Sequence, residues 1–217
     1  MSLSLRAILW DLDGVLADTA DLHYHAWAAA LAEFGFPYSR AIFDSHFGMN
    51  NADTLAFLLG RPPAPDWLAD VSARKEAAFR SAARGQVQTL PGVREWLGRF
   101  QSWGLLQAVA SSAPQANIDA LIDGLQLRSY FAALVSAEGL PGKPDPAVFL
   151  AAAQKLNAAS AHCLVIEDSP HGLAAAHRAG MKCLAVLTTH PAARLQAADL
   201  VVDNLARLTP QALSQLQ

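Results

Sequence analysis

The stretch RAILWDLDGV, residues 6–15, decides the fold, because a short apolar run is followed at once by two carboxylates and a glycine. Residues 6–10 are mostly free of polar alternation, which is typical of a strand buried on both faces. Asp11 and Asp13 stand where this strand ends, and Gly14 permits a sharp turn. Two carboxylates this close repel each other unless a cation offsets their charge. The stretch predicts a buried strand with an acidic site at its carboxyl end; the alternative is a polar strand end followed by a turn.

Further apolar runs of the same kind recur along the chain, at residues 105–110, 133–135, 163–166, 183–187 and 200–202. Helical patterns separate them, at residues 91–103, 114–123, 146–156 and 170–179. Strands that alternate with helices at this spacing favour an α/β fold with a doubly wound parallel sheet. Right-handed crossovers place the carboxyl ends of such strands along one edge, where ligands bind.

One region, residues 18–87, interrupts the alternation and contains no credible buried strand. Residues 21–34 and 66–84 read as helices, with shorter helical pieces between them. Its aromatic side chains favour burial over disorder, and they are Trp27, Phe34, Phe43, Phe47, Phe57, Trp67 and Phe79. We therefore predict an α/β core domain formed by residues 1–17 and 88–217, with an inserted all-helical cap domain at residues 18–87.

The composition predicts a globular protein and excludes several classes. The chain has 217 residues, of which 53% are hydrophobic and 16% charged, and its net charge is −3. It can build a core, unlike a disordered or fibrous protein, and it offers no basic field for a nucleic acid. Its apolar stretches are shorter than the ~18 residues of a membrane span, and Asp11 interrupts the first one before a signal peptide is complete. Cys163 and Cys183 form no CxxC pair, so we expect a cytoplasmic protein with buried thiols. We also expect a monomer or weak dimer.

Polar groups follow other predicted strands as well. Ser111 and Ser112 lie between a strand end and a helix start, where free N–H groups and hydroxyls can hold an anion, although helix capping would also explain one serine. Lys143 lies in the turn GKPDP, residues 142–146, which can present one positive charge to a phosphate; a solvated loop lysine is the alternative. Glu167 and Asp168 end a further strand, where an acid can also be a simple helix cap. Together these groups offer oxygen ligands for a hard divalent cation and a clamp for an anion.

This set of motifs resembles the haloacid dehalogenase superfamily. The order of DxDGV at 11–15, a strand-end serine, GKPDP at 142–146 and ED at 167–168 carries the resemblance, which extends from Arg6 to about Leu208. A helical insertion directly after the first motif is similar to the subgroup with a small all-helical cap on a Rossmann-like core. The segment DTADLH, residues 18–23, resembles the β-phosphoglucomutase branch and its phosphatase relatives.

The resemblance implies a role for each matching residue. Asp11 is expected to be the nucleophile that forms an aspartyl-phosphate, and Asp13 the general acid and base. Ser111 and Ser112 are expected to bind phosphoryl oxygens, and Lys143 to pair with the phosphate and orient Asp11.

The implied cofactor is Mg²⁺. Its expected ligands are Asp11, the main-chain carbonyl of Asp13, and Asp168, with Glu167 as an outer or second ligand. The implied partner is a small phosphorylated substrate.

The cap sequence departs from the mutases of this branch. Those mutases resemble one another in a cap-loop lysine, and this sequence has Phe47 at that position. They also carry an arginine that binds a second phosphate, and this sequence has Asn51 there. His23 and Lys75 do match a hinge-region histidine and a cap lysine, so we include His23, Asn51 and Lys75 among the expected substrate contacts. Without the bidentate arginine, a bisphosphate intermediate loses a charge-assisted partner. We therefore expect a Mg²⁺-dependent phosphatase of small phosphorylated metabolites, of the sugar-phosphate kind, with a β-phosphoglucomutase-type mutase as the alternative.

A non-enzymatic phospho-acceptor that resembles receiver domains is a third hypothesis, because receivers also place acids and a lysine at parallel-strand ends. The inserted cap argues against it, since a receiver has no need to enclose a small molecule.

Overall fold

A single parallel sheet forms the centre of the protein. The computed structural model describes residues 5–216. Its sheet is 6-stranded, in the order β3-β2-β1-β4-β5-β6. The strands are β1 (Ala7–Trp10), β2 (Leu106–Ser111), β3 (Ala133–Ser136), β4 (Cys163–Glu167), β5 (Lys182–Val186) and β6 (Leu200–Val202). All neighbours pair in parallel, and Leu9 of β1 lies opposite Ala108 of β2 and Val165 of β4. The strand order reverses on either side of β1, so the carboxyl end of β1 opens at the switch point where ligands bind in such sheets.

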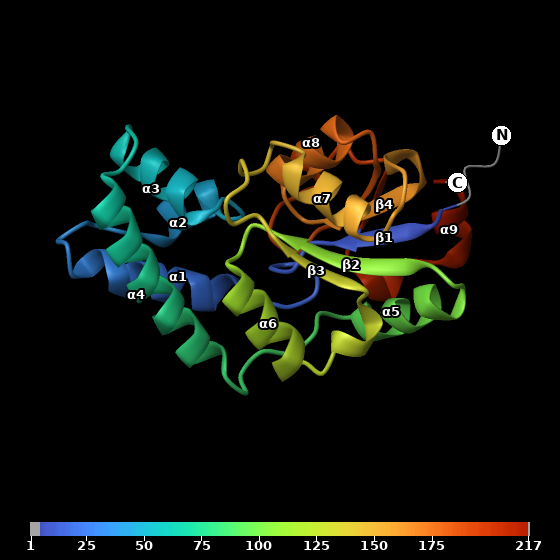
Figure 1. Cartoon of the computed structure of the whole chain (residues 1–217), viewed down its shortest axis with the longest axis horizontal. Coiled ribbons are helices and arrows are strands. Elements are labelled where there is room, and N and C mark those ends of the chain that lie inside the picture. The colour runs from blue at the N-terminus through green and yellow to red at the C-terminus, as the bar shows by residue number, and fades with distance from the viewer. Residues whose placement is uncertain (1–4, 217) are drawn as a thin grey trace.

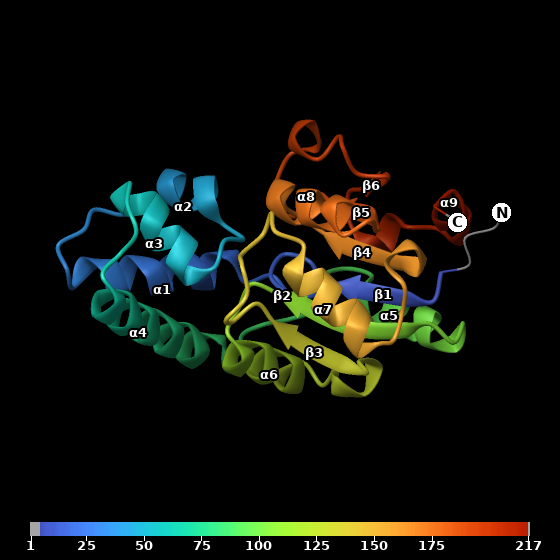
Figure 2. The ribbon, with the colours of Figure 1, turned by 45° about the horizontal axis from the view of Figure 1, so that its top comes forward.

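Helices cover both faces of this sheet (Figures 1 and 2). Side chains of β1 alternate between the two faces: Ile8 and Trp10 join one apolar cluster, and Ala7 and Leu9 join the other. The first cluster includes residues of α5 (Val93–Ser102), α6 (Gln115–Gly124) and α9 (Pro210–Ser214), and the second includes residues of α7 (Ala147–Lys155) and α8 (Pro170–Arg178). Short 3-10 turns lie in the connections, namely η1 (Arg128–Tyr130), η2 (Ser160–His162), η3 (Ala192–Arg194) and η4 (Leu205–Arg207). The predicted doubly wound α/β fold is confirmed.

The insertion after β1 is entirely helical within the described residues. It contains α1 (Ala20–Ala32), α2 (Arg40–His46), α3 (Asn51–Leu59) and α4 (Pro65–Ala83), and Figure 1 shows these helices as a separate group beyond one edge of the sheet. They pack around a core of their own that includes Trp27, Phe43 and Val71. The predicted helical cap is therefore confirmed.

The limits of the two domains are set by where the chain passes between them. Ala17 forms β-bridges with Asp13 and with Thr89, so the outgoing and returning connections lie side by side. We propose that the cap spans residues 18–87 and the core residues 1–17 and 88–217, with residues 1–4 and 217 outside the described part of the chain.

The expected burial of the cap aromatics is wrong for two residues. Phe34 is 38% exposed and Phe57 is 51% exposed. Phe34 lies just beyond the end of α1 and forms a T-shaped contact with Trp67, with 5.7 Å between the ring centroids. Each helix around so small a core buries only one of its faces. An aromatic side chain on another face therefore remains partly exposed to solvent.

Other expectations about burial agree with the structure. Cys163 and Cys183 are both buried and free, and burial raises the pKa of the Cys163 thiol to about 11. Within residues 5–216, the structure has no helix of the length and apolarity that a membrane crossing requires.

Candidate active site

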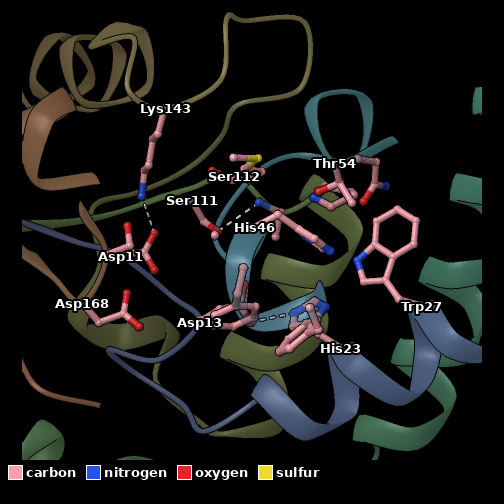
Figure 3. Close-up of a pocket in the computed structure, with 18 of the residues that line it drawn as sticks. Asp11, Asp13, His23, Trp27, His46, Thr54, Ser111, Ser112, Lys143 and Asp168 are labelled. Atoms are coloured by element: carbon pink, nitrogen blue, oxygen red, sulfur yellow. Dashed lines mark hydrogen bonds and ion pairs between the residues drawn. The ribbon is translucent and has the colours of Figure 1, made fainter. Parts of the chain in front are cut away.

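Every residue predicted to act on substrate or metal lies around one cavity between the sheet edge and the cap. The residues in question are Asp11, Asp13, His23, Asn51, Lys75, Ser111, Ser112, Lys143, Glu167 and Asp168. Figure 3 shows Lys143 and Asp168 close to Asp11, with His23 and Trp27 approaching from the cap. The fold therefore brings together side chains that lie far apart in the sequence, from Asp11 near the start to Asp168.

Asp11 and Lys143 form the centre of the cavity. The backbone N–H of Asp11 donates to Ile166 O at 3.0 Å, which extends the sheet by one residue and fixes where the carboxylate points. Lys143 Nζ donates to Asp11 Oδ1 at 2.5 Å and to Glu167 Oε1 at 2.6 Å. Burial, with the charges of Glu167 and Asp13, raises the pKa of Asp11 to about 7, although Lys143 opposes this rise. Burial also disfavours the Lys143 ammonium, but Asp11 and Glu167 outweigh burial and raise its pKa above the ordinary value.

Glu167 is held in place by the residues that lead into α8. Its Oε2 accepts hydrogen bonds from the backbone N–H groups of Asp168 and Ser169, both at 2.8 Å, and from Ser169 Oγ at 2.9 Å. A Cβ atom at Gly172 would lie only 1.8 Å from Glu167 Oε1, so the glycine makes room for this carboxylate. Burial raises the pKa of Glu167, but Lys143 and these donors outweigh it and hold that pKa below its usual value. Glu167 thus fixes the position of Lys143.

The acids around Asp11 form a candidate site for a divalent cation. Carboxylate oxygens of Asp11, Glu167 and Asp168 lie within 4.8 Å of one another, and Lys143 supplies a single positive charge among them. Burial and the charges of Glu167 and Asp11 raise the pKa of Asp168 well above its usual range, although Thr189 Oγ1 donates to Asp168 Oδ2 at 2.5 Å. Hard oxygen donors with surplus negative charge fit Mg²⁺. The donor set is therefore suited to the implied ion.

The backbone at Gly14 gives the site room for Asp168. Gly14 has a φ of +83°, as the predicted sharp turn requires, and a Cβ atom there would lie 2.0 Å from Asp168 Oδ2.

The carboxylate of Asp13 contacts the cap side of the cavity. Its Oδ1 accepts from Thr19 Oγ1 at 2.6 Å and from His23 Nε2 at 3.0 Å, and the ring of His23 stacks on Phe79 with centroids 3.9 Å apart. Burial and the neighbouring ammonium of Lys75 lower the pKa of His23 despite Asp13, so His23 is neutral at pH 7. Burial raises the pKa of Asp13, but the contacts with His23 and Thr19 outweigh it and hold that pKa below its ordinary value.

The two serines follow β2 as predicted. Ser111 is the last residue of the strand, and its Oγ accepts from Ala113 N at 3.1 Å, which leaves the hydroxyl hydrogen free to donate. Ser112 Oγ is buried and has no hydrogen-bond partner among the described residues. Buried hydroxyls are normally paired, so an unpaired one in this cavity is available to a ligand oxygen.

The cap contributes an ion pair of which only the lysine was predicted from the sequence. Lys75 Nζ donates to Glu76 Oε1 at 2.8 Å and lies 5.3 Å from the ring centre of Trp27. Asn51 Nδ2 donates to the same Glu76 oxygen at 2.9 Å. Lys75 and Asn51 were predicted to contact substrate; both line the cavity, and both are bonded to a glutamate that sequence reasoning did not single out.

Sequence reasoning also missed other residues around the cavity, namely Trp27, His46, Thr54 and the contact residues Thr19 and Thr189. His46 bonds to Tyr38 OH at 2.7 Å and is buried at the cavity wall. Thr189 had a signal that could have found it, since it follows a predicted strand as the other site residues do. The cap residues had none, because a helix in sequence does not show which of its sides meets the core.

Comparison with known proteins agrees with this geometry. Residues 8–186 match the family model of haloacid dehalogenase-like hydrolases. The chain belongs to this family.

The relatives of this hydrolase place it in the β-phosphoglucomutase-like branch. Protein CbbY of Rhodobacter capsulatus is 32% identical over 228 residues, covering 99% of this chain and 100% of the relative. Hexitol phosphatase B of Escherichia coli (strain K12) is 31% identical over 219 residues, covering 96% of each chain. The crystal structure of β-phosphoglucomutase from Clostridium difficile is similar with a TM-score of 0.87 at 25% identity, covering 98% of this chain and 96% of that one.

Some relatives are longer proteins. This hydrolase spans 55% of the chloroplastic 5-amino-6-(5-phospho-D-ribitylamino)uracil phosphatase of Arabidopsis thaliana, to which it is 29% identical.

Proposed function

We propose that this protein is a Mg²⁺-dependent phosphatase of small phosphorylated metabolites of the sugar-phosphate kind, acting through an aspartyl-phosphate. The observation that carries the proposal is the contact of Lys143 Nζ with Asp11 Oδ1 at 2.5 Å, inside a buried cluster of carboxylates at the sheet edge. A phosphoryl group bound at this point can contact the Lys143 ammonium and the Asp11 carboxylate at the same time. The family match supports a hydrolase, and the similarity to hexitol phosphatase B supports a phosphorylated sugar or sugar alcohol as substrate.

The first step transfers the phosphoryl group to Asp11. A carboxylate oxygen of Asp11 forms a bond to phosphorus as the bond from phosphorus to the ester oxygen breaks, and the leaving oxygen takes a proton from Asp13. An approaching phosphate raises the pKa of Asp13 by charge repulsion, which supplies the protonated form that the isolated site does not favour. Lys143 and the hydroxyls of Ser111 and Ser112 hold the phosphoryl oxygens.

The second step releases phosphate. A water molecule gives a proton to Asp13 and attacks the phosphorus, the bond to Asp11 breaks, and the free carboxylate and inorganic phosphate are restored. The contacts of Asp13 with Thr19 and His23 keep its carboxylate in one position for both proton transfers.

Charge neutralisation is the main demand of the first step. A carboxylate and a phosphate 4 Å apart repel by about 4 kcal/mol per charge pair at an effective dielectric constant of 20. Lys143 offsets one charge. Mg²⁺ would supply the remaining positive charge. Asp11, Asp168 and the main-chain carbonyl of Asp13 would hold the ion, with Glu167 nearby.

The mutase alternative has no specific observation in its favour. Phe47 and Asn51 line the cavity where a second phosphate would need cations, and Asn51 already donates to Glu76. A cytoplasmic location, a monomeric or weakly dimeric state and the lack of a nucleic-acid partner stay predictions from the sequence.

The proposal is tested by phosphate release from a panel of sugar phosphates with Mg²⁺. Asp11→Asn keeps the shape of the side chain but removes the nucleophile, so we expect turnover to fall at least about 1000-fold while far-UV circular dichroism stays unchanged. Asp203→Asn, at an exposed position outside the cavity, is the matched control and should keep wild-type turnover. Equal activity of wild type and Asp11→Asn would refute the proposal.

A further inference from the structure

The cap wall of the cavity contains a carboxylate that has no place in the mechanism above. Glu76 lies in α4, is 5% exposed and lines the cavity. Its Oε1 accepts from Lys75 Nζ at 2.8 Å and from Asn51 Nδ2 at 2.9 Å. Burial raises the pKa of Glu76, but Lys75 outweighs it and lowers that pKa, so the side chain is negatively charged at pH 7. A fixed negative charge is unexpected in a cavity that must accept a phosphate.

The core domain prevents this carboxylate from turning away. Asn117, on α6, is fully buried and donates from Nδ2 to Glu76 Oε2 at 2.5 Å. The other atom of the same amide, Oδ1, accepts from Arg80 Nη1 at 2.9 Å. Figure 2 shows α4 of the cap running toward α6 of the core, and these contacts join the two helices. Glu76 is thus held by partners on both sides and cannot rotate out of the cavity without leaving Asn117 unpaired.

The contacts of Glu76 also decide which cations the cap can offer to a substrate. Among residues 5–216, no arginine lines the cavity, and Lys75 is the ammonium of its cap wall. Lys75 is paired with Glu76, and burial lowers the pKa of His46 to about 4, so this histidine is neutral at pH 7. The cap wall therefore has a net charge near zero, with its negative charge held in place.

We propose that Glu76 is a specificity-determining residue that restricts the enzyme to monophosphates with an uncharged distal end and rejects bisphosphates. The inference rests on the proposed function and specifies its substrate class. When one phosphate lies against Asp11 and Lys143, the rest of the molecule points at the cap wall. A hydroxyl there can bond to Thr54, while a second phosphate would meet the Glu76 carboxylate and find no free cation.

A charge-relocating double variant tests the inference with little disturbance of the contacts. In Glu76→Gln combined with Asn117→Asp, the new amide oxygen still accepts from Lys75 and Asn51, and the new amide nitrogen donates to the new carboxylate on α6. That carboxylate also accepts from Arg80. The negative charge leaves the cavity wall for a position that does not line the cavity, and the net charge of the protein is unchanged. The single variant Glu76→Gln is the second test should the double variant not fold.

The measurement is kcat/KM, with Mg²⁺, for fructose 1-phosphate, fructose 6-phosphate and fructose 1,6-bisphosphate. We expect the wild-type protein to favour a monophosphate, and the double variant to raise the ratio of bisphosphate to monophosphate kcat/KM by at least about tenfold. Glu33→Gln is the matched control, because Glu33 pairs with Arg74 on the outer surface of the cap, and it should keep the wild-type ratio. A ratio that stays unchanged in both Glu76 variants while phosphate is still released overturns the inference and leaves the proposed function intact.

A binding measurement separates the inference from the chemistry. Calorimetric titration of the same sugar phosphates into the Asp11→Asn protein, with and without the double variant, needs no turnover. If wild type releases no phosphate but the double variant still shifts relative affinity toward the bisphosphate, the proposed function fails and the selectivity of Glu76 stands. If relative affinity does not shift, the inference fails regardless of turnover.

Discussion

At the level of single residues, the site is governed by the balance between burial and charge. Lys143 remains charged although it is 4% exposed, because it contacts two carboxylates at hydrogen-bond distance. One ammonium cannot offset a third acid, and the pKa of Asp168 is accordingly raised by burial and by its acidic neighbours. The unequal number of charges, rather than any single residue, is what makes a divalent cation a fitting partner.

A second residue, His46, shows how the same balance affects stability. Burial lowers its pKa from 6.5 to about 4, so as pH falls the unfolded chain takes up a proton before the folded protein does. The stabilising contribution of neutral His46 is complete above pH 6.5 and is lost as pH falls toward 4. We therefore predict that lowering the pH from 7 to 5 costs wild type roughly 1 to 2 kcal/mol more than it costs His46→Gln.

Urea unfolding at the two pH values measures this difference. His25→Gln, at an exposed position on α1, is the control and should behave as wild type does. An identical pH dependence in wild type and His46→Gln would contradict the assignment of a depressed pKa to His46.

At the level of elements, the start of α8 determines the geometry of the acids in the cavity. Ser169 is the N-cap, its Oγ accepts from Gly172 N, and Pro170 occupies the first helical turn. Ser169 and the preceding Asp168 donate their backbone N–H groups to Glu167, which in turn positions Lys143. A helix-capping motif that can be recognised in the sequence thus also holds Glu167 and Lys143 in position.

Gly172→Ala is predicted to damage both stability and activity. The added Cβ would lie 1.8 Å from Glu167 Oε1, and Glu167 is too firmly bonded to move aside. We expect a loss of roughly 1 to 3 kcal/mol in the free energy of unfolding, together with reduced kcat because Lys143 shifts.

The matched control is Gly98→Ala in α5, where a Cβ meets nothing within 4 Å. That change should stabilise the helix by roughly 0.5 to 1 kcal/mol, because glycine has the greater freedom to lose. Chemical denaturation and phosphate release measure both variants. Equal effects of the two substitutions would mean that Glu167 is not confined as the structure indicates.

At the level of the whole molecule, the acidic site exists only because remote segments meet. The sheet brings the ends of β1 and β4 together, and the cap closes the cavity from the other side. Carboxylates gathered in this way repel each other in the folded protein and not in the unfolded chain, so an ion that binds them stabilises the folded state alone.

Mg²⁺ is therefore predicted to raise the melting temperature of wild type. At an ion concentration about 100 times the dissociation constant, the gain of roughly 2.7 kcal/mol corresponds to a rise of about 5–10 °C for a chain of this size. Asp168→Asn should abolish most of this rise, and EDTA should reverse it in wild type.

Differential scanning fluorimetry measures the effect, with Asp203→Asn as the control that keeps the full response. A rise of the same size in Asp168→Asn would show that the ion binds elsewhere.

The core could be predicted from the sequence because its signals are local. A run such as residues 163–166 is apolar throughout, Pro170 and Gly180 bracket a helix, and the acids stand directly after the strands. Burial in the cap was harder to predict. Phe57 and Phe43 are both aromatic residues of the insert, but Phe43 is buried and Phe57 is exposed. Amphipathic helices of a small domain can be recognised one by one, while the side that each helix buries depends on its neighbours.

The sequence by itself determined the alternation of strands and helices and the position of the insert, because short-range hydrophobic pattern and turn chemistry specify both. It also predicted Asp11, Asp13, Lys143 and Asp168 as site residues, from their places after the strands and from the motifs that resemble the family. Only the tertiary structure decided that Glu76 would neutralise Lys75 and be held by Asn117. The physical reason is that the contact with Asn117 joins α4 to α6, and that the Lys75–Glu76 ion pair becomes strong only when tertiary packing excludes water from it.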